Sequence, residues 1–272
     1  MIRVVSHGKQ LHRGIYNLHS KFASAVNFFS GNDFAFVVTM NTGAGPLNIV
    51  LQGMRLDSLN SLKIDNDCIC LNEMRFPFSN STSFDPRIEI YGYDTDNFKR
   101  NVNIFERALI EFSPPTSLAF LLDDNRKMNF TSSFDIEYVR RFESGYRTIF
   151  SDNHLRGIEI IKGLGPGLTP SGDDFISGLL IALNVRQTAF GTDLSQTIHS
   201  IYQTAQSTNP FTNAFLRCAA HGEVSEKFKR LIESLFHSER EEIIENTQQL
   251  LTVGATSGAD QAVGFLIGLR RF

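Results

Sequence analysis

Residues 162–175 read KGLGPGLTPSGDDF and lead into an apolar run from Phe175 to Leu183. Glycine permits backbone angles that are closed to other residues, so the three alternating glycines predict a loop. Thr169 suits a helix N-cap, and Pro170 suits the first position of a helix. We expect the N–H groups of residues 171–173 to point outward without a helical partner, which makes this stretch a candidate anion site.

A second, weaker copy of this motif lies near the C-terminus. Residues 171–183, SGDDFISGLLIAL, align without a gap on residues 257–269, SGADQAVGFLIGL. In each copy an Asp precedes a Gly by four residues, which puts both on one helical face. We therefore expect two helices that pack side by side, with Asp174 and Asp260 facing a shared cleft. Alternatively, Asp173, Asp174 and Asp260 only complement the positive ends of helices.

The composition is typical of a soluble globular protein. The chain has 272 residues, enough for one large or two ordinary domains, with 42% hydrophobic and 20% charged residues. A net charge of −3 argues against nucleic-acid binding. The N-terminus lacks a signal-peptide pattern, and no apolar run approaches the ~20 residues of a membrane span, so we expect a cytoplasmic protein without membrane contact. With 24 Phe and no Trp, the core should be rich in phenylalanine.

The pattern of apolar residues changes near residue 94. Before it, short β-branched and aromatic runs predict strands at 34–40, 47–51, 62–64, 67–71 and 87–91, and the break at 43–46 is consistent with a hairpin. After it, Val102, Phe105 and Leu109 begin a series of helical spacings. We predict an α+β fold. Residues 1–95 form a β-rich domain, a small antiparallel sheet, sandwich or barrel, and residues 96–272 form a mainly α-helical domain.

Two adjacent carboxylates complicate an anion site, because carboxylates repel phosphate. Asp173 and Asp174 could turn away from the ligand. A Mg²⁺ ion could instead bridge them to a phosphate or carboxylate. Alternatively, Asp174 could accept hydrogen bonds from a carbamoyl NH₂ group while the loop amides hold the anionic end. The sequence leaves these three arrangements open.

Other candidate residues lie on a predicted helix after residue 209. Asn213, Arg217 and His221 form an i, i+4, i+8 stripe. Such a stripe is usually a solvated face, but an arginine can also clamp a carboxylate with two hydrogen bonds. The three cysteines, Cys68, Cys70 and Cys218, are too few and too unevenly spaced for a disulfide framework or a zinc cage, so we expect buried thiols.

Three segments resemble a bacterial family whose members are often labelled as carboxylases. These segments are residues 163–174, 215–222 and 254–260, and the Gly43-Ala44-Gly45-Pro46 turn also fits the family pattern. The family includes the AllH-type subunit of oxamate carbamoyltransferase, which belongs to allantoin and purine catabolism. The resemblance implies a subunit that acts in carbamoyl transfer between oxamate and carbamoyl phosphate. It also implies partner subunits and small anionic substrates.

The resemblance and the motifs together define the expected site residues. Asp173, Asp174 and Asp260 orient the carbamoyl group or hold Mg²⁺, and Arg217 binds a carboxylate. The expected ligand-binding residues are Gly163, Gly165, Gly167, Thr169, Ser171, Gly172, Thr256, Ser257, Gly258 and Asn213. Two alternatives stay open. The paired Asp motifs resemble those of the magnesium-dependent ADP-ribosylglycohydrolases, which indicates a hydrolase. A non-catalytic assembly subunit would use its glycines for packing alone.

Overall fold

A computed structural model describes residues 2–151 and 153–272, and the fold is α+β, as predicted. The chain divides into two units. The first contains the chain through Arg87 together with Val224–Lys229, and the second contains Ile88–Glu223 and Arg230–Phe272. The domain boundary at residue 95 stays a prediction. None of the helices in the described ranges is long and apolar enough to cross a membrane.

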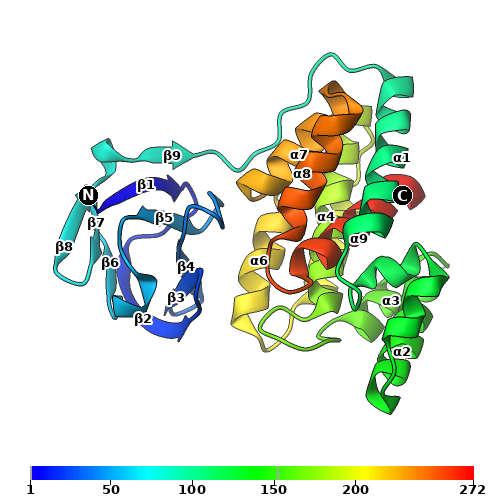
Figure 1. The fold of residues 1–272 in the computed structure, drawn as a ribbon, viewed down its shortest axis with the longest axis horizontal. Coiled ribbons are helices and arrows are strands. Elements are labelled where there is room, and N and C mark those ends of the chain that lie inside the picture. Colours follow the sequence, from blue (N-terminus) through cyan, green and yellow to red (C-terminus); the bar gives the residue numbers. More distant parts are fainter. Residues whose placement is uncertain (1, 152) are drawn as a thin grey trace. The chain divides into compact units, whose positions relative to one another are not determined.

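The first unit is a curled, mostly antiparallel sheet of nine strands (Figure 1). Bulges between Val4 and Ser6 and between Leu18 and Ser20 contribute to the curl, because an extra residue bends and twists its strand. The spatial order is β8-β7-β6-β2-β3-β4-β5-β1-β9. The strands are β1 Arg3–Gly8, β2 Gly14–Lys21, β3 Ala25–Ser30, β4 Asp33–Val38, β5 Asn48–Gln52, β6 Leu62–Ile64, β7 Cys68–Leu71, β8 Met74–Pro77 and β9 Thr82–Phe84, and two 3-10 turns are Leu56–Ser58 and Phe78–Asn80.

Two predictions for this sheet are wrong. Strands β4 and β5 pair in parallel, with Phe36 opposite Asn48, so the glycine-rich break between them is not a hairpin turn. The segment 87–91 forms only an isolated bridge at Arg87 instead of a strand. The inner face is built from alternate residues of the strands. Val26, Phe28, Val37 and Ile49 are buried there in one hydrophobic cluster.

The segment Val224–Lys229 returns to the sheet and is fixed there by hydrogen bonds to the main chain of Ala44 and Pro86. The Glu226 N–H donates to the Ala44 carbonyl at 2.9 Å, and the Ala44 N–H donates to Glu226 Oε2 at 3.1 Å. The Val224 N–H donates to the Pro86 carbonyl at 3.0 Å. The Gly43–Pro46 turn therefore has a structural role, because it receives a distant part of the chain.

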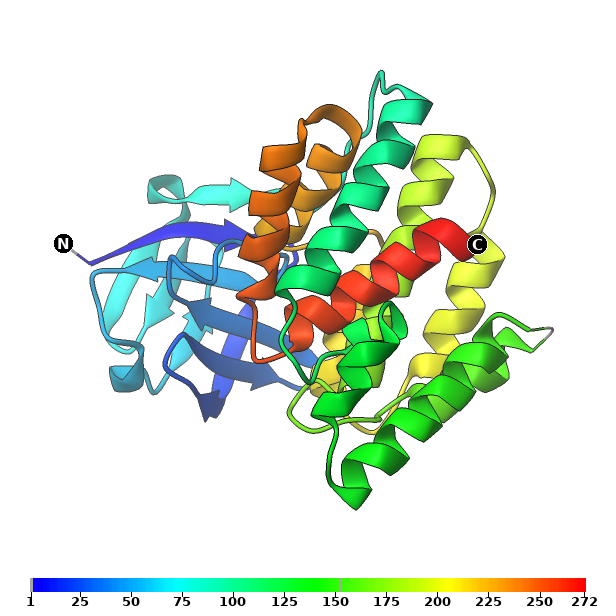
Figure 2. The same ribbon diagram turned by 45° about the vertical axis from the view of Figure 1, so that its right-hand side comes forward.

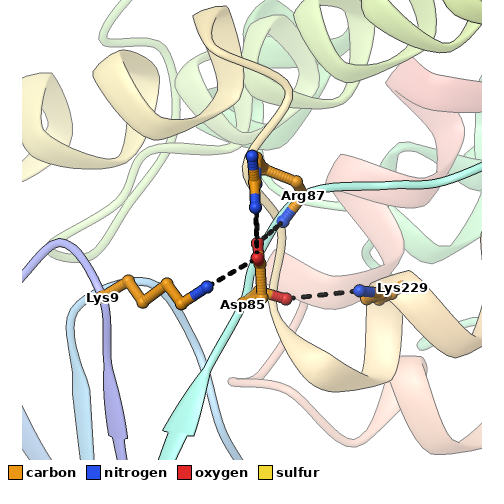
Figure 3. Close-up of polar contacts among 4 residues, drawn as sticks. All are labelled: Lys9, Asp85, Arg87 and Lys229. Atoms are coloured by element: carbon orange, nitrogen blue, oxygen red, sulfur yellow. Dashed lines mark hydrogen bonds and ion pairs between the residues drawn. The ribbon is translucent and has the colours of Figure 1, made fainter.

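Charged side chains gather around Asp85 next to this segment (Figure 3). Lys9 Nζ donates to Asp85 Oδ2 at 2.7 Å, and Arg87 binds both carboxylate oxygens at 2.6 and 2.9 Å. Lys229 Nζ donates to the Asp85 backbone carbonyl at 3.3 Å. The hydrogen bonds from Arg87 and Lys9 hold the pKa of Asp85 well below its usual range. Asp85 thus stays ionised and holds together three cationic side chains.

The second unit is helical. The helix α9 lies among the other helices of this unit, and its residues from Gly258 to Leu269 are largely buried (Figure 2). The helices are α1 Thr95–Phe112, α2 Ser133–Ile149, α3 His154–Ile161, α4 Ser171–Phe190, α5 Ser195–Ala205, α6 Pro210–Ala220, α7 Glu226–His237, α8 Arg240–Leu251 and α9 Ser257–Arg271, and two 3-10 segments are Leu118–Leu121 and Asp124–Asn129. The first turn of α7 belongs to the first unit.

Phenylalanines fill the core of the helical unit, as the composition predicts. Phe142 of α2 contacts Phe175 of α4 edge to face, with ring centroids 5.6 Å apart. Phe105 of α1 and Phe265 of α9 have centroids 6.2 Å apart. All four rings are essentially fully buried. Aromatic pairs in such geometries add to the stability that their burial provides, so α4 and α9 are fixed on several sides.

Candidate functional site

The helices α4 and α9 pack side by side through their glycines, as the repeated motif predicts. A Cβ atom on Gly178 would overlap the Gln261 carbonyl, and one on Gly264 would overlap the Phe175 carbonyl. Gly178 corresponds to Gly264 in the alignment of the two copies, and Phe175 corresponds to Gln261. The contact is therefore reciprocal, which is the property of a local two-fold arrangement.

The first turns of both helices exchange polar contacts in the same crossed manner. Asp174 interacts with the side chain of Ser257 in the other copy, and Asp260 interacts with the side chain of Ser171. Hydrogen bonds from both hydroxyls lower the pKa of the carboxyl group that they contact. The Thr169 and Ser257 hydroxyls are 3.1 Å apart and connect the loop before α4 to α9. The repeat thus builds one joined pair of helix starts.

Burial dominates the electrostatics of Asp260. Its side chain is fully buried, Oδ1 accepts a 2.7 Å hydrogen bond from the Leu118 N–H, and Oδ2 has no partner among the described residues. Burial raises the pKa of Asp260 to about 6, against the opposing hydrogen bonds from Leu118, Ser171 and Thr256. The expected shared cleft is therefore not open to solvent at Asp260.

Asp174 shares this environment. The residue as a whole is partly exposed, but its Oδ2 atom is buried and lacks a partner within the described ranges. Burial raises the pKa of Asp174 well above its usual value, and the nearby charge of Asp260 raises it further. Two carboxyl groups in such a site favour a state in which at least one of them keeps its proton.

Asp173 has a different partner. Its Oδ1 accepts a 2.7 Å hydrogen bond from the Gly163 N–H, and its side chain is buried. Burial raises the pKa of Asp173, while Gly163, Thr212 and Lys162 lower it. Among the described residues, the three carboxylates do not form one compact group of potential metal ligands. Asp173 therefore fixes the start of the glycine loop.

The helix start differs from the prediction in two respects. The N-cap of α4 is Pro170 instead of Thr169, and it makes no side-chain capping bond. The Gly172 N–H donates to the Leu164 carbonyl at 2.8 Å, and the Asp173 N–H donates to the Pro170 carbonyl at 2.9 Å. The expectation that these two N–H groups point outward is therefore wrong, because the loop folds back onto the first turn.

Backbone N–H groups without a hydrogen-bond acceptor are found in the loop that precedes α4. Within the described ranges, no group accepts a hydrogen bond from the backbone N–H of Gly165, Gly167, Leu168 or Thr169. Gly163, Gly165 and Gly167 have φ angles of 68°, 120° and 98°, which favour glycine. Gly167 is exposed, and the other three residues are partly exposed. Several N–H groups of this kind in a positive-φ turn can form an anion-binding concavity.

The corresponding segment before α9 has one positive-φ glycine instead of three. Gly254 has a φ of 64°, and Gly258 packs so closely that an added Cβ would overlap the Leu250 carbonyl. Gly172 has the same role at α4, against the Ile161 carbonyl. Thr256 is the N-cap of α9, and its side chain contacts Asp260. The expected binding residues Gly172, Thr256 and Gly258 thus lie at the packed helix starts.

The stripe on α6 is partly structural. Asn213 Oδ1 accepts from the Ser207 N–H at 3.1 Å, and its Nδ2 donates to the Ser207 carbonyl at 2.8 Å. Arg217 is half-buried, and its carbonyl lies 2.8 Å from Nδ1 of the exposed His221. Asn209 was not among the predicted site residues. This residue caps α6 and donates to the Leu168 carbonyl of the glycine loop at 3.0 Å. Its position directly before Pro210 was the available signal for a cap.

The part of the chain that contains this site matches a known protein family. Residues 161–269 match the model of a family described as oxamate carbamoyltransferase subunit AllH. This match confirms the predicted resemblance, and it covers the glycine loop and both copies of the motif. No solved structure matches the chain.

Proposed function

We propose that the protein is a subunit of an oxamate carbamoyltransferase-like enzyme of allantoin and purine catabolism and works in the cytoplasm with partner subunits. The family match over residues 161–269 supports the role as a subunit. Carbamoyl transfer between carbamoyl phosphate and oxamate requires groups that bind anions and groups that orient the carbamoyl amide.

The loop of residues 163–170 is the proposed binding site for the anionic end of a substrate. The main observation in support is that four backbone N–H groups have no hydrogen-bond acceptor in the described ranges. They are those of Gly165, Gly167, Leu168 and Thr169. An anion would satisfy these donors at little cost in reorganisation, since the hydrogen bonds from Gly163 to Asp173 and from Asn209 to Leu168 already hold the loop in place. Asp173 stabilises this loop through Gly163.

Asp174 and Asp260 have a proposed role beside this loop. Because a protonated carboxyl group is both donor and acceptor, the raised pKa of the partly exposed Asp174 suits a hydrogen bond to a carbamoyl group without repulsion of the neighbouring anion, and the buried Asp260 acts through Asp174 by raising that pKa. Arg217 is the proposed second anion contact, for the oxamate carboxylate. One observation favours the alternative of a magnesium-dependent hydrolase, namely the buried, unpartnered Oδ2 atoms of Asp174 and Asp260.

Binding of carbamoyl phosphate and oxamate to the complex purified from the native host tests the site. Gly167→Ala introduces strain at a φ of 98° with no close neighbour, and Gly191→Ala, at a φ of 67° at the end of α4, is the control for a positive-φ substitution outside the loop. We expect calorimetric affinity to fall at least about tenfold in Gly167→Ala and to be unchanged in Gly191→Ala. Equal affinities would count against the loop. A purified protein without partner subunits would count against the role as a subunit, and Mg²⁺-dependent binding lost in Asp174→Asn would favour the hydrolase.

A further inference from the structure

Two cysteines lie together on the first unit, outside the segment that matches the family. Cys68 and Cys70 occupy strand β7, whose alternate residues Ile69 and Leu71 belong to the hydrophobic cluster of the sheet. Successive side chains of a strand point to opposite faces. The two thiols therefore lie on the face opposite the cluster, where Cys68 is buried and Cys70 is partly exposed.

This face of the sheet is polar. Lys63 of β6 and Arg75 of β8 pair with Cys70 on its two sides. Arg75 donates to Cys68 Sγ at 3.4 Å, and Lys63 Nζ lies 2.8 Å from Asp65 Oδ1. Asp65 begins the turn between β6 and β7, and its N–H donates to the Cys68 carbonyl at 3.0 Å. The turn thus brings a carboxylate next to the thiols.

The distances fit a metal ion better than a disulfide. The two Sγ atoms are 3.7 Å apart, far beyond a disulfide bond of about 2.05 Å. Two thiolates bound to one tetrahedral Zn²⁺ at about 2.3 Å would lie about 3.8 Å apart. A carboxylate oxygen of Asp65 lies within 4.8 Å of both sulfurs. The three groups therefore form a ligand set that needs only small side-chain adjustments.

We propose that Asp65, Cys68 and Cys70 bind a thiophilic divalent cation of the Zn²⁺ type, with a water molecule in the fourth position. Each thiol releases its proton to solvent when it binds the ion. Lys63 leaves Asp65 on binding, which is feasible because its side chain is 52% exposed. Arg75 moves away from Cys68 and no longer donates to its sulfur.

Titration of the full-length, reduced protein with Co²⁺ tests this proposal, because tetrahedral cobalt–thiolate complexes absorb in the near-ultraviolet and visible range. We expect one equivalent of Co²⁺ to produce these bands and Zn²⁺ to abolish them. Cys70→Ser should lose the bands, and Asp65→Asn should weaken binding at least about tenfold. Cys218→Ser is the matched control, since this third cysteine is buried in the helical unit.

A second measurement does not depend on the cysteine variants. Zn²⁺ should protect Cys70 from alkylation in the wild-type protein, as read by mass spectrometry of the modified peptide. The proposal is overturned if the wild type shows no cobalt–thiolate bands. It is also overturned if a folded Cys70→Ser variant keeps them, or if Zn²⁺ leaves the alkylation rate of Cys70 unchanged.

Discussion

The two copies of the repeated motif, at the starts of α4 and α9, share the residues that pack and differ in the residues that precede them. Ser171, Asp174 and Gly178 have counterparts in the second copy, and all of these residues make reciprocal contacts. The first copy alone has Asp173 and a loop with three positive-φ glycines. The repeat thus explains how the two helices pack against each other. The candidate anion site lies in the glycine loop before α4, which the second copy does not have.

Substitution of the paired glycines should have the largest effect on this arrangement. In Gly178→Ala and in Gly264→Ala the new methyl group meets a backbone carbonyl, so we expect each to lower the free energy of unfolding by roughly 3 kcal/mol. Gly191→Ala, at the end of the same helix, should cost only about 1 kcal/mol, since its Cβ meets open space. Urea denaturation measures all three. A large loss of unfolding free energy in only one of the paired variants would show that the contact is not reciprocal.

The contribution of Asp260 to stability should depend on pH in the opposite sense to that of a carboxylate whose pKa is lowered by folding. Burial raises its pKa from 3.8 to about 6, so the folded state binds its proton more tightly than the unfolded state does. The contribution of Asp260 to stability is therefore fully present below about pH 4 and falls by roughly 3 kcal/mol as the pH rises through 6. Asp260→Asn should lack this decrease in urea denaturation between pH 4 and 7.

Asp135→Asn serves as the control for this measurement. Hydrogen bonds from Ser132 lower the pKa of the partly exposed Asp135, so its contribution appears above the pKa of the unfolded state and is lost as the pH falls. Its removal should change the pH dependence in the opposite direction. An identical pH profile for the wild type and Asp260→Asn would contradict the raised pKa.

The crossed hydroxyl contacts should give the smallest effect. In double-mutant cycles we expect a coupling of about 1 kcal/mol between Ser257→Ala and Asp174→Asn. A similar value should connect Ser171→Ala with Asp260→Asn. The pairs within one copy, such as Ser171 with Asp174, should be coupled by less than about 0.5 kcal/mol. Stronger coupling within a copy than between copies would show that the helix starts do not exchange contacts.

Local signals in the sequence predicted the helices and their pairing. The spacing of Val102, Phe105 and Leu109 correctly predicted the position of α1. The glycines of the repeat predicted the close contact of α4 with α9. The different partners of Asp173 and Asp174 were not predictable, because neighbouring carboxylates on one helix start look alike until the tertiary partners Gly163 and Ser257 are known.

Long-range pairing explains the errors in the β-rich part. The residues around Gly43–Pro46 carry turn signals that fit a hairpin, but β4 pairs with β5 in parallel. Turn residues report local torsions and do not specify the direction of the next strand. The return of Val224–Lys229 had no signal either, since a helix start that contacts a sheet looks like any other acidic helix start.

The return of this segment also bears on how the chain is made. Glu226 follows its partner Ala44 by 182 residues, so the sheet leaves the ribosome long before that contact is available. Domains tend to fold as units during synthesis, from the N-terminus onward. The nascent sheet of this protein must therefore wait for most of the second unit to be translated, with the Ala44 N–H and carbonyl hydrated in the meantime.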